Sequence, residues 1–191
     1  GFRVARGGCQ ELFGVRADLC TFAKAVANGY PISVLAGRED IMRRLGKGVV
    51  HGGTFTAHSI ALAAAEKTLE ILAETPALQT IAEYGMKLRA GVSQILAQRG
   101  IKHSFSGHPS MSGLFFSEQP PRDYRDWASS DYTFYEALAP HLHDLGVLCE
   151  PDSREPWFVC EAHDARCLAE TLRAFETAVD RVVDDAKHQN P

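Results

Sequence analysis

The sequence has no long hydrophobic run and no excess of positive charge. Its longest apolar stretches, such as residues 60–65 and 113–116, fall far short of the roughly 20 residues that a transmembrane helix needs. The 20 Lys and Arg residues against 24 Asp and Glu residues give a formal net charge of −4, which excludes a polybasic nucleic-acid-binding protein. We therefore expect neither a membrane span nor a nucleic-acid partner.

Cysteine pairs and metal-ligand patterns are absent as well. The five cysteines include no Cys-x-x-Cys pair, which suits a reducing compartment better than a disulfide framework. His141 and His143 lie two residues apart on an expected helix, so they point to different faces and predict no metal site. The N-terminus shows neither an initiating Met nor a signal-peptide pattern. We expect a cytoplasmic protein, and we expect that the given sequence begins partway along a longer chain.

What is present is the composition of an ordinary globular protein, with 45% hydrophobic and 23% charged residues. At about 150 residues per domain, the length of 191 residues suggests one domain, or one and a fraction. We assign residues 1–75 to part of a mixed α/β unit. Residues 76–191 are assigned to a compact α+β unit with helices on one face of a small sheet.

Hydrophobic spacing and turn residues predict the elements of both units. Longer helices are expected at residues 57–73, 76–98, 132–145 and from 163 to near the C-terminus. Short strands are expected at residues 19–22, 32–36, 101–105, 113–117, 146–148 and 157–160. A turn is expected at residues 28–31, a short helical segment at 38–45 and a long polar loop at 118–130.

Lys24 is the first candidate for chemistry, because it follows an expected buried strand and its neighbours are small or apolar. An amine in an apolar pocket has a lowered pKa, becomes nucleophilic near neutral pH and can form a Schiff base with a carbonyl compound. Pyridoxal phosphate (PLP) is the carbonyl cofactor that such a lysine most often serves. The alternative is an ordinary lysine that extends to water from the end of a strand.

A second candidate is the sequence Gly52-Gly53-Thr54, just before the expected helix at residues 57–73. It offers close backbone approach, N–H groups and a hydroxyl near a helix N-terminus, which are the donors that a phosphate needs. The alternative is a flexible turn with a threonine near a helix cap. Lys24 and this loop together could face one cofactor, within one subunit or across a dimer interface.

At these positions the sequence resembles a known family. The segments are 18–32 (DLCTFAKAVANGYPI), 37–42 (GREDIM), 53–57 (GTFTA), 1–5 and 158–163. They look like the class-III aminotransferases, PLP-dependent enzymes of fold type I, and most like the glutamate-1-semialdehyde 2,1-aminomutase branch. The resemblance spans essentially the whole chain and implies the end of the large, mixed-sheet PLP-binding domain in residues 1–75, with the small C-terminal α+β domain in residues 76–191.

The resemblance also implies roles for single residues. Lys24 would form the internal aldimine and carry the proton between the substrate α-carbon and the cofactor. Gly53 and Thr54 would bind the PLP phosphate, Thr54 that of the neighbouring subunit in a homodimer. Glu155 aligns roughly with an acidic residue near the substrate, and Arg154 beside it could hold a substrate carboxylate, although an exposed Arg-Glu pair in a loop is the alternative.

Two departures from the family pattern qualify these roles. The chain has His58-Ser59 where the family usually has Asn-Pro, which changes the local loop. The family's pyridinium-pairing carboxylate, glycine-rich phosphate loop and ring-stacking aromatic all precede the point where this sequence begins, so we expect an incomplete chain that is inactive or nearly so by itself.

The resulting hypothesis is a PLP-dependent aminotransferase or aminomutase that acts on an amino acid or amino-aldehyde through Lys24. The alternative is a non-catalytic homologue that serves as a dimerisation module.

Overall fold

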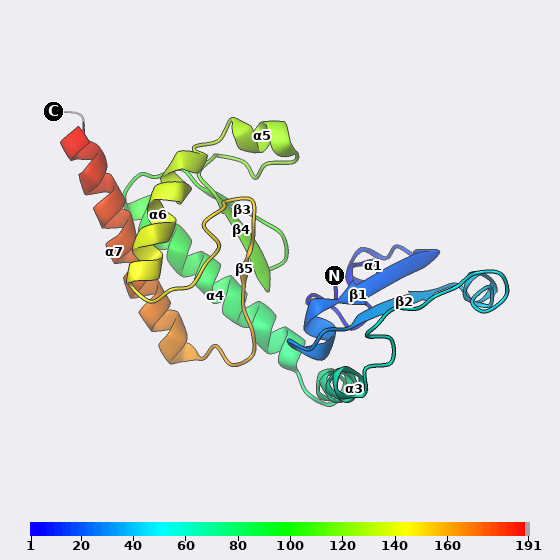
Figure 1. Ribbon diagram of the computed structural model, residues 1–191. Coiled ribbons are helices and arrows are strands. Elements are labelled where there is room, and N and C mark those ends of the chain that lie inside the picture. Colours follow the sequence, from blue (N-terminus) through cyan, green and yellow to red (C-terminus); the bar gives the residue numbers. More distant parts are fainter. Residues whose placement is uncertain (190–191) are drawn as a thin grey trace. The chain divides into compact units, whose positions relative to one another are not determined.

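The computed structural model describes residues 1–189, and the chain divides into two compact units, Gly1–Leu78 and Gln79–Pro191 (Figure 1). Each unit has its own hydrophobic cluster of buried side chains. No helix within the described residues is long and apolar enough to span a bilayer.

The first unit is built around a two-stranded antiparallel sheet. Strand β1 (Leu19–Ala23) pairs with β2 (Ser33–Gly37), with Leu19 opposite Gly37 and Ala23 opposite Ser33. The short helices of this unit are α1 (Cys9–Phe13), the 3-10 turn η1 (Lys24–Ala27) and α2 (Glu39–Met42). The turn predicted at residues 28–31 is confirmed, since Asn28 and Gly29 both have positive φ, at 46° and 109°.

Helix α3 (Ser59–Glu74) packs on η1 through its smallest residues. Ala65, which is 7% exposed, belongs to one cluster with the buried Val26 and Ala27 of η1, and Ala61 is fully buried. Alanine side chains allow the two backbones to approach closely. The rest of α3 is largely exposed, so this unit has a small core.

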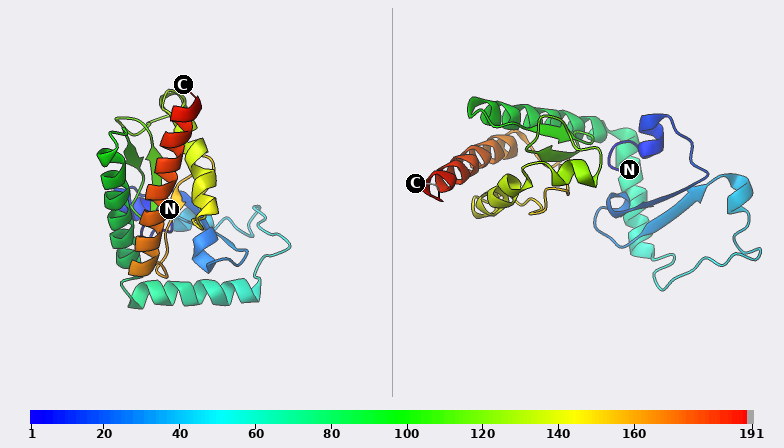
Figure 2. Two further views of the ribbon diagram at one scale, coloured as in Figure 1. Left: turned by 90° about the vertical axis from the view of Figure 1, so that its left-hand side faces the viewer. Right: turned by 90° about the horizontal axis from the view of Figure 1, so that it is seen from above.

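The second unit combines a three-stranded antiparallel sheet with three long helices. The strands are β3 (Ser104–Ser106), β4 (Met111–Phe115) and β5 (Trp157–Phe158), in the order β3-β4-β5. The long helices are α4 (Ala77–Gln98), α6 (Tyr132–Asp144) and α7 (Ala165–Gln189). Both views of Figure 2 show α7 between α4 and α6. The core of the unit joins all three helices to β4 and contains the fully buried Leu96, Leu138 and Phe175.

Two expectations for this unit are wrong. Residues 146–148 form no strand. They continue from the last turn of α6, because the Gly146 and Val147 amides donate hydrogen bonds to the carbonyl oxygens of His143 and Leu142 and not to a neighbouring strand. The polar loop at 118–130 contains a short helix, α5 (Tyr124–Ala128). Asp123 starts that helix, because its carboxylate accepts hydrogen bonds from the Arg125 and Asp126 amides.

Candidate functional site

Lys24 lies at the point where β1 turns into η1, and its backbone is in the left-handed region with φ of 55°. A left-handed conformation costs a non-glycine residue about 1–2 kcal/mol, and such strained positions concentrate at functional sites. The sequence offers no signal for it, because glycine, asparagine and aspartate are the residues that favour this region. The strained backbone makes Lys24 a candidate that composition alone does not single out.

The expectation that the Lys24 amine is sheltered in an apolar pocket is wrong for this structure. The Lys24 side chain is exposed. Val26 and Ala27, which follow Lys24 in η1, belong to the small core of this unit, whereas Lys24 does not. Lys24 is therefore an accessible primary amine that directly follows the end of β1.

The loop from Gly52 to Ala57 precedes α3 and is exposed throughout. A turn closes within it, with the Thr56 amide 3.0 Å from the Gly53 carbonyl oxygen. Within residues 1–189, the backbone N–H groups of Gly53 and Thr54 donate to no protein acceptor, and the space beside Gly52 is open. The loop therefore presents free donors to an anion, which fits a phosphate group.

The N-cap of α3 is His58, a role that the sequence did not reveal. Its Nδ1 atom accepts a hydrogen bond from the Ala61 amide at 3.2 Å. The departure from the family pattern at this position thus supplies the helix cap, and the Thr54 hydroxyl is not needed for it. Asparagine, aspartate, serine and threonine are the usual N-cap residues, so a histidine at this position carries little sequence signal for a helix cap.

Arg154 and Glu155 lie in the second unit, in the loop before β5. Arg154 pairs with Asp152, with its Nε 2.9 Å from Oδ1, and its guanidinium carbon lies 5.0 Å from the centre of the Trp127 ring. The Arg154 guanidinium holds the pKa of Asp152 at about 2. Glu155 is exposed, and its amide donates to the Asp152 carbonyl oxygen at 3.0 Å. Arg154 is therefore engaged by Asp152 and not by Glu155.

The candidates thus fall into two groups. Lys24, Gly53 and Thr54 belong to the first unit and share an exposed, donor-rich character. Arg154 and Glu155 belong to the second unit. Within the described residues 1–189, no three His, Cys, Asp or Glu side chains are grouped so that they could hold a metal ion.

Residues 2–175 match the sequence model of the family described as aminotransferase class-III. The chain belongs to this family. Among relatives of the class-III aminotransferases, the glutamate-1-semialdehyde 2,1-aminomutase of Aquifex aeolicus is 32% identical over 181 residues, which are 94% of this chain and 43% of that protein. The corresponding enzyme of Methanothrix thermoacetophila is 35% identical over 178 residues, which are 92% of this chain and 41% of the length of that protein.

Solved structures agree with the family and give the fold. The FumI protein of Sphingopyxis sp. MTA144, in its PLP internal aldimine form, superposes on this chain with a TM-score of 0.84 and is 31% identical in sequence. The superposition covers 98% of this chain and 42% of the FumI chain. The fold is therefore that of fold-type-I PLP-dependent transaminases, as the resemblance implied. The class-III aminotransferase chain described here spans about 43% of the length of the curated relatives it matches.

Proposed function

We propose that this chain carries the cofactor-binding lysine and the phosphate-binding threonine of a PLP-dependent aminotransferase or aminomutase. The observation that supports this most is the family match over residues 2–175, which includes both Lys24 and Thr54. The proposed substrate is an amino acid or amino-aldehyde, of the kind named by the aminomutase relatives. The proposed assembly is a homodimer.

The residues of the first unit fit the cofactor by the chemistry they present. PLP, when bound, supplies an aldehyde that condenses with an amine and a ring that stabilises negative charge at the substrate α-carbon. Lys24 Nζ is an exposed primary amine at a strained backbone position, so it is accessible to that aldehyde and can afterwards carry the proton. The free N–H groups of Gly53 and Thr54, with the Thr54 hydroxyl, would hold the phosphate oxygens.

The second unit is proposed to contribute contacts to substrate. Arg154 is the candidate for a substrate carboxylate, because guanidinium and carboxylate form two parallel hydrogen bonds. Asp152 already occupies that guanidinium, so substrate would compete with this carboxylate. Glu155, which is exposed, is the candidate for the substrate amino group.

The experiment that tests the proposal is reductive labelling. The chain is incubated with PLP, reduced with borohydride and digested, and the labelled lysines are quantified by mass spectrometry. We expect the label to concentrate on Lys24 and to disappear from this position in Lys24→Arg, because a guanidinium forms no stable Schiff base. Lys47→Arg, a substitution of another exposed lysine in the same unit, is the matched control and should leave the label on Lys24.

A second measurement separates the phosphate site from the amine. Thr54→Val should weaken PLP binding, measured by the absorbance of the bound cofactor, because it removes one hydroxyl donor without changing the size of the side chain. Equal labelling of all exposed lysines, together with no cofactor absorbance that an amine substrate shifts, would contradict the proposal and favour the non-catalytic dimerisation module.

A further inference from the structure

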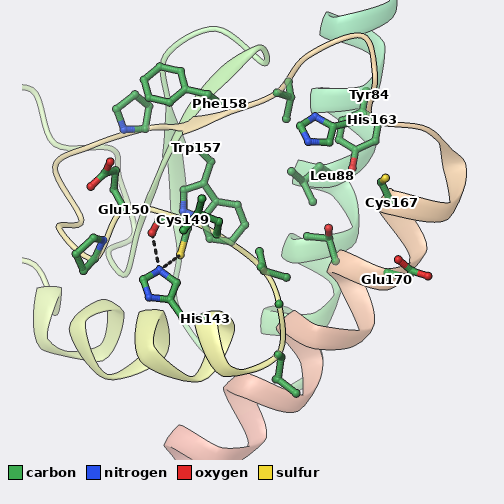
Figure 3. A pocket seen from close by; sticks show the side chains of 18 residues that line it. Tyr84, Leu88, His143, Cys149, Glu150, Trp157, Phe158, His163, Cys167 and Glu170 are labelled. Carbon is green, nitrogen blue, oxygen red and sulfur yellow. Dashed lines mark hydrogen bonds between the residues drawn. The ribbon is translucent and has the colours of Figure 1, made fainter. Parts of the chain in front are cut away.

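The second unit contains a pocket of about 720 Å³, here called the Trp157 pocket. It is lined by α4, by α7 and by the chain between His143 and Val159 (Figure 3). Figure 3 shows Trp157 at its centre, with Glu150 at one end and the Tyr84–His163 pair and Glu170 at the other. The volume lies within the range of about 300–1,000 Å³ that is typical of small-molecule sites.

Aromatic and aliphatic groups make up much of the wall of the pocket. The Trp157 ring is half-buried, and Tyr84 and His163 stack with ring centres 5.4 Å apart and planes 26° from parallel. Leu88, at 7% exposure, closes the α4 side. The aromatic faces favour a ligand with an apolar or aromatic body, and the negatively charged face of a Trp ring attracts a cation.

The charged groups that line the pocket are of one sign. Glu150 and Glu170 line it, and no Lys or Arg does. Glu170 is already paired with Arg166, 2.8 Å away, whereas the Glu150 carboxylate forms no hydrogen bond or ion pair within residues 1–189. His163 Nδ1 accepts a hydrogen bond from the Cys160 amide, 3.0 Å away. Electrostatics thus favour a cation and disfavour an anion.

A covalent site at Cys149 is the competing interpretation, since this thiol lines the pocket with His143 Nε2 3.8 Å from its sulfur. The same Nε2 atom donates a hydrogen bond to the Cys149 carbonyl oxygen at 2.6 Å, so it is protonated and cannot act as the base for the thiol. Burial also raises the pKa of the Cys149 thiol, which keeps it in the unreactive protonated form. Non-covalent binding is the chemistry that remains.

We infer that the Trp157 pocket binds a small organic amine in its cationic form, with the ammonium group near Glu150 and an aromatic or branched aliphatic body against Trp157 and the Tyr84–His163 pair. The inference does not rest on the proposed function. None of the residues proposed to bind cofactor or substrate lines this pocket.

The test compares two probes that have a phenyl ring on a short chain and differ in charge. 2-Phenylethylamine and 3-phenylpropionate are titrated into the full chain, and binding is followed by calorimetry and by ligand-observed NMR. We expect saturable binding of the amine and at least tenfold weaker binding of the carboxylate. Equal affinity for both probes, or no saturable binding of the amine, would overturn the inference.

Variants locate the binding. Glu150→Gln should weaken amine binding by about two- to fivefold, the size expected for one solvent-exposed ion pair. The matched control is Glu136→Gln, an exposed position on α6 that does not line the pocket, and it should bind the amine as the unmodified chain does. Cys167→Phe, which fills the α7 side of the pocket, should abolish binding while the circular dichroism spectrum stays unchanged. Amine binding that survives Cys167→Phe, or that Glu136→Gln and Glu150→Gln weaken equally, would place it elsewhere and contradict the inference.

Discussion

The Nε atom of Arg89 on α4 lies 2.5 Å from the Ser112 hydroxyl oxygen on β4. The same guanidinium donates to the carbonyl oxygens of Ser106, at 3.1 Å, and Gly107, at 2.8 Å, and lies 5.5 Å from the centre of the Phe105 ring. Burial lowers the pKa of Arg89. One side chain therefore connects the β3–β4 hairpin to α4. Its hydrogen-bond acceptors are two carbonyl oxygens and a hydroxyl oxygen, and none of them is a carboxylate.

Loss of this guanidinium should destabilise the second unit. Arg89→Met leaves two carbonyls and a hydroxyl without their donor, so we expect the free energy of unfolding to fall by about 1–3 kcal/mol. Arg89→Lys should retain only part of the stability that Arg89 provides, because a single ammonium group lacks the planar array of donors with which the guanidinium reaches acceptors on both strands. Urea denaturation measures the free energy of unfolding of both variants. The control is Lys87→Met, an exposed position on the same helix, which should change stability by less than about 0.5 kcal/mol.

A second prediction concerns two glycines of α4 that differ in what they face. A Cβ at Gly85 would lie 2.0 Å from the Pro109 carbonyl oxygen, which is backbone, whereas a Cβ at Gly91 would lie 2.5 Å from the end of the Leu172 side chain. Gly85→Ala should therefore cost more than about 2 kcal/mol, because helix and loop must separate. Gly91→Ala should be close to neutral, since Leu172 can adopt another rotamer and alanine favours the helix. Thermal denaturation of the two variants checks the order, and equal costs would contradict it.

The longer helices could be predicted from the sequence because their signal is local. The spacing of apolar residues predicted a helix at 76–98 and another at 132–145, and the structure has α4 at Ala77–Gln98 and α6 at Tyr132–Asp144. Strands were predicted less well. A short apolar run such as 146–148 becomes a strand only if a partner lies beside it, and pairing between distant segments leaves no mark on a single sequence.

The candidate site was predictable as residue types but not as geometry. The pattern around Lys24 indicated a chemistry, whereas its positive φ and its exposure are properties of the folded chain that the residue types do not encode. The ion pair of Arg154 with Asp152 was missed for a similar reason: the choice between Asp152 and the adjacent Glu155 depends on the turn that the loop adopts.

The third prediction follows from the strained backbone of Lys24. Its side chain is exposed, so replacing it should remove little packing. Lys24→Gly should relieve the left-handed conformation and Lys24→Ala should not, so the glycine variant should keep the turn better by about 1 kcal/mol. Hydrogen exchange of the amides in η1 and β1 measures this locally. Equal protection in the two variants would show that no strain is stored at this position.

The fourth prediction is the titration of Asp152. Its carboxylate should titrate at about pH 2, below the ordinary aspartate value of about 3.9, first because of the hydrogen bond from the Arg154 side chain and second because of the bond from the Arg154 amide. A depressed pKa means that the pair stabilises the fold above about pH 4 and that this contribution is lost as the pH falls toward 2. The pair is solvent-accessible, with 37% exposure of the Asp152 side chain, so the contribution should stay below about 1 kcal/mol.

Carbon-detected NMR of the Asp152 carboxyl group between pH 6 and pH 2 tests this directly. Arg154→Gln removes the guanidinium but keeps the backbone donor, whose nitrogen is 2.9 Å from Oδ1, so the pKa should rise only part of the way to the ordinary value. Arg125→Gln, an exposed arginine of the same unit, should leave the titration where it was. An unchanged Asp152 pKa in Arg154→Gln would mean that the guanidinium is not held by this carboxylate. Arg154 would then be free for another anion, and substrate would not have to displace Asp152 to reach it.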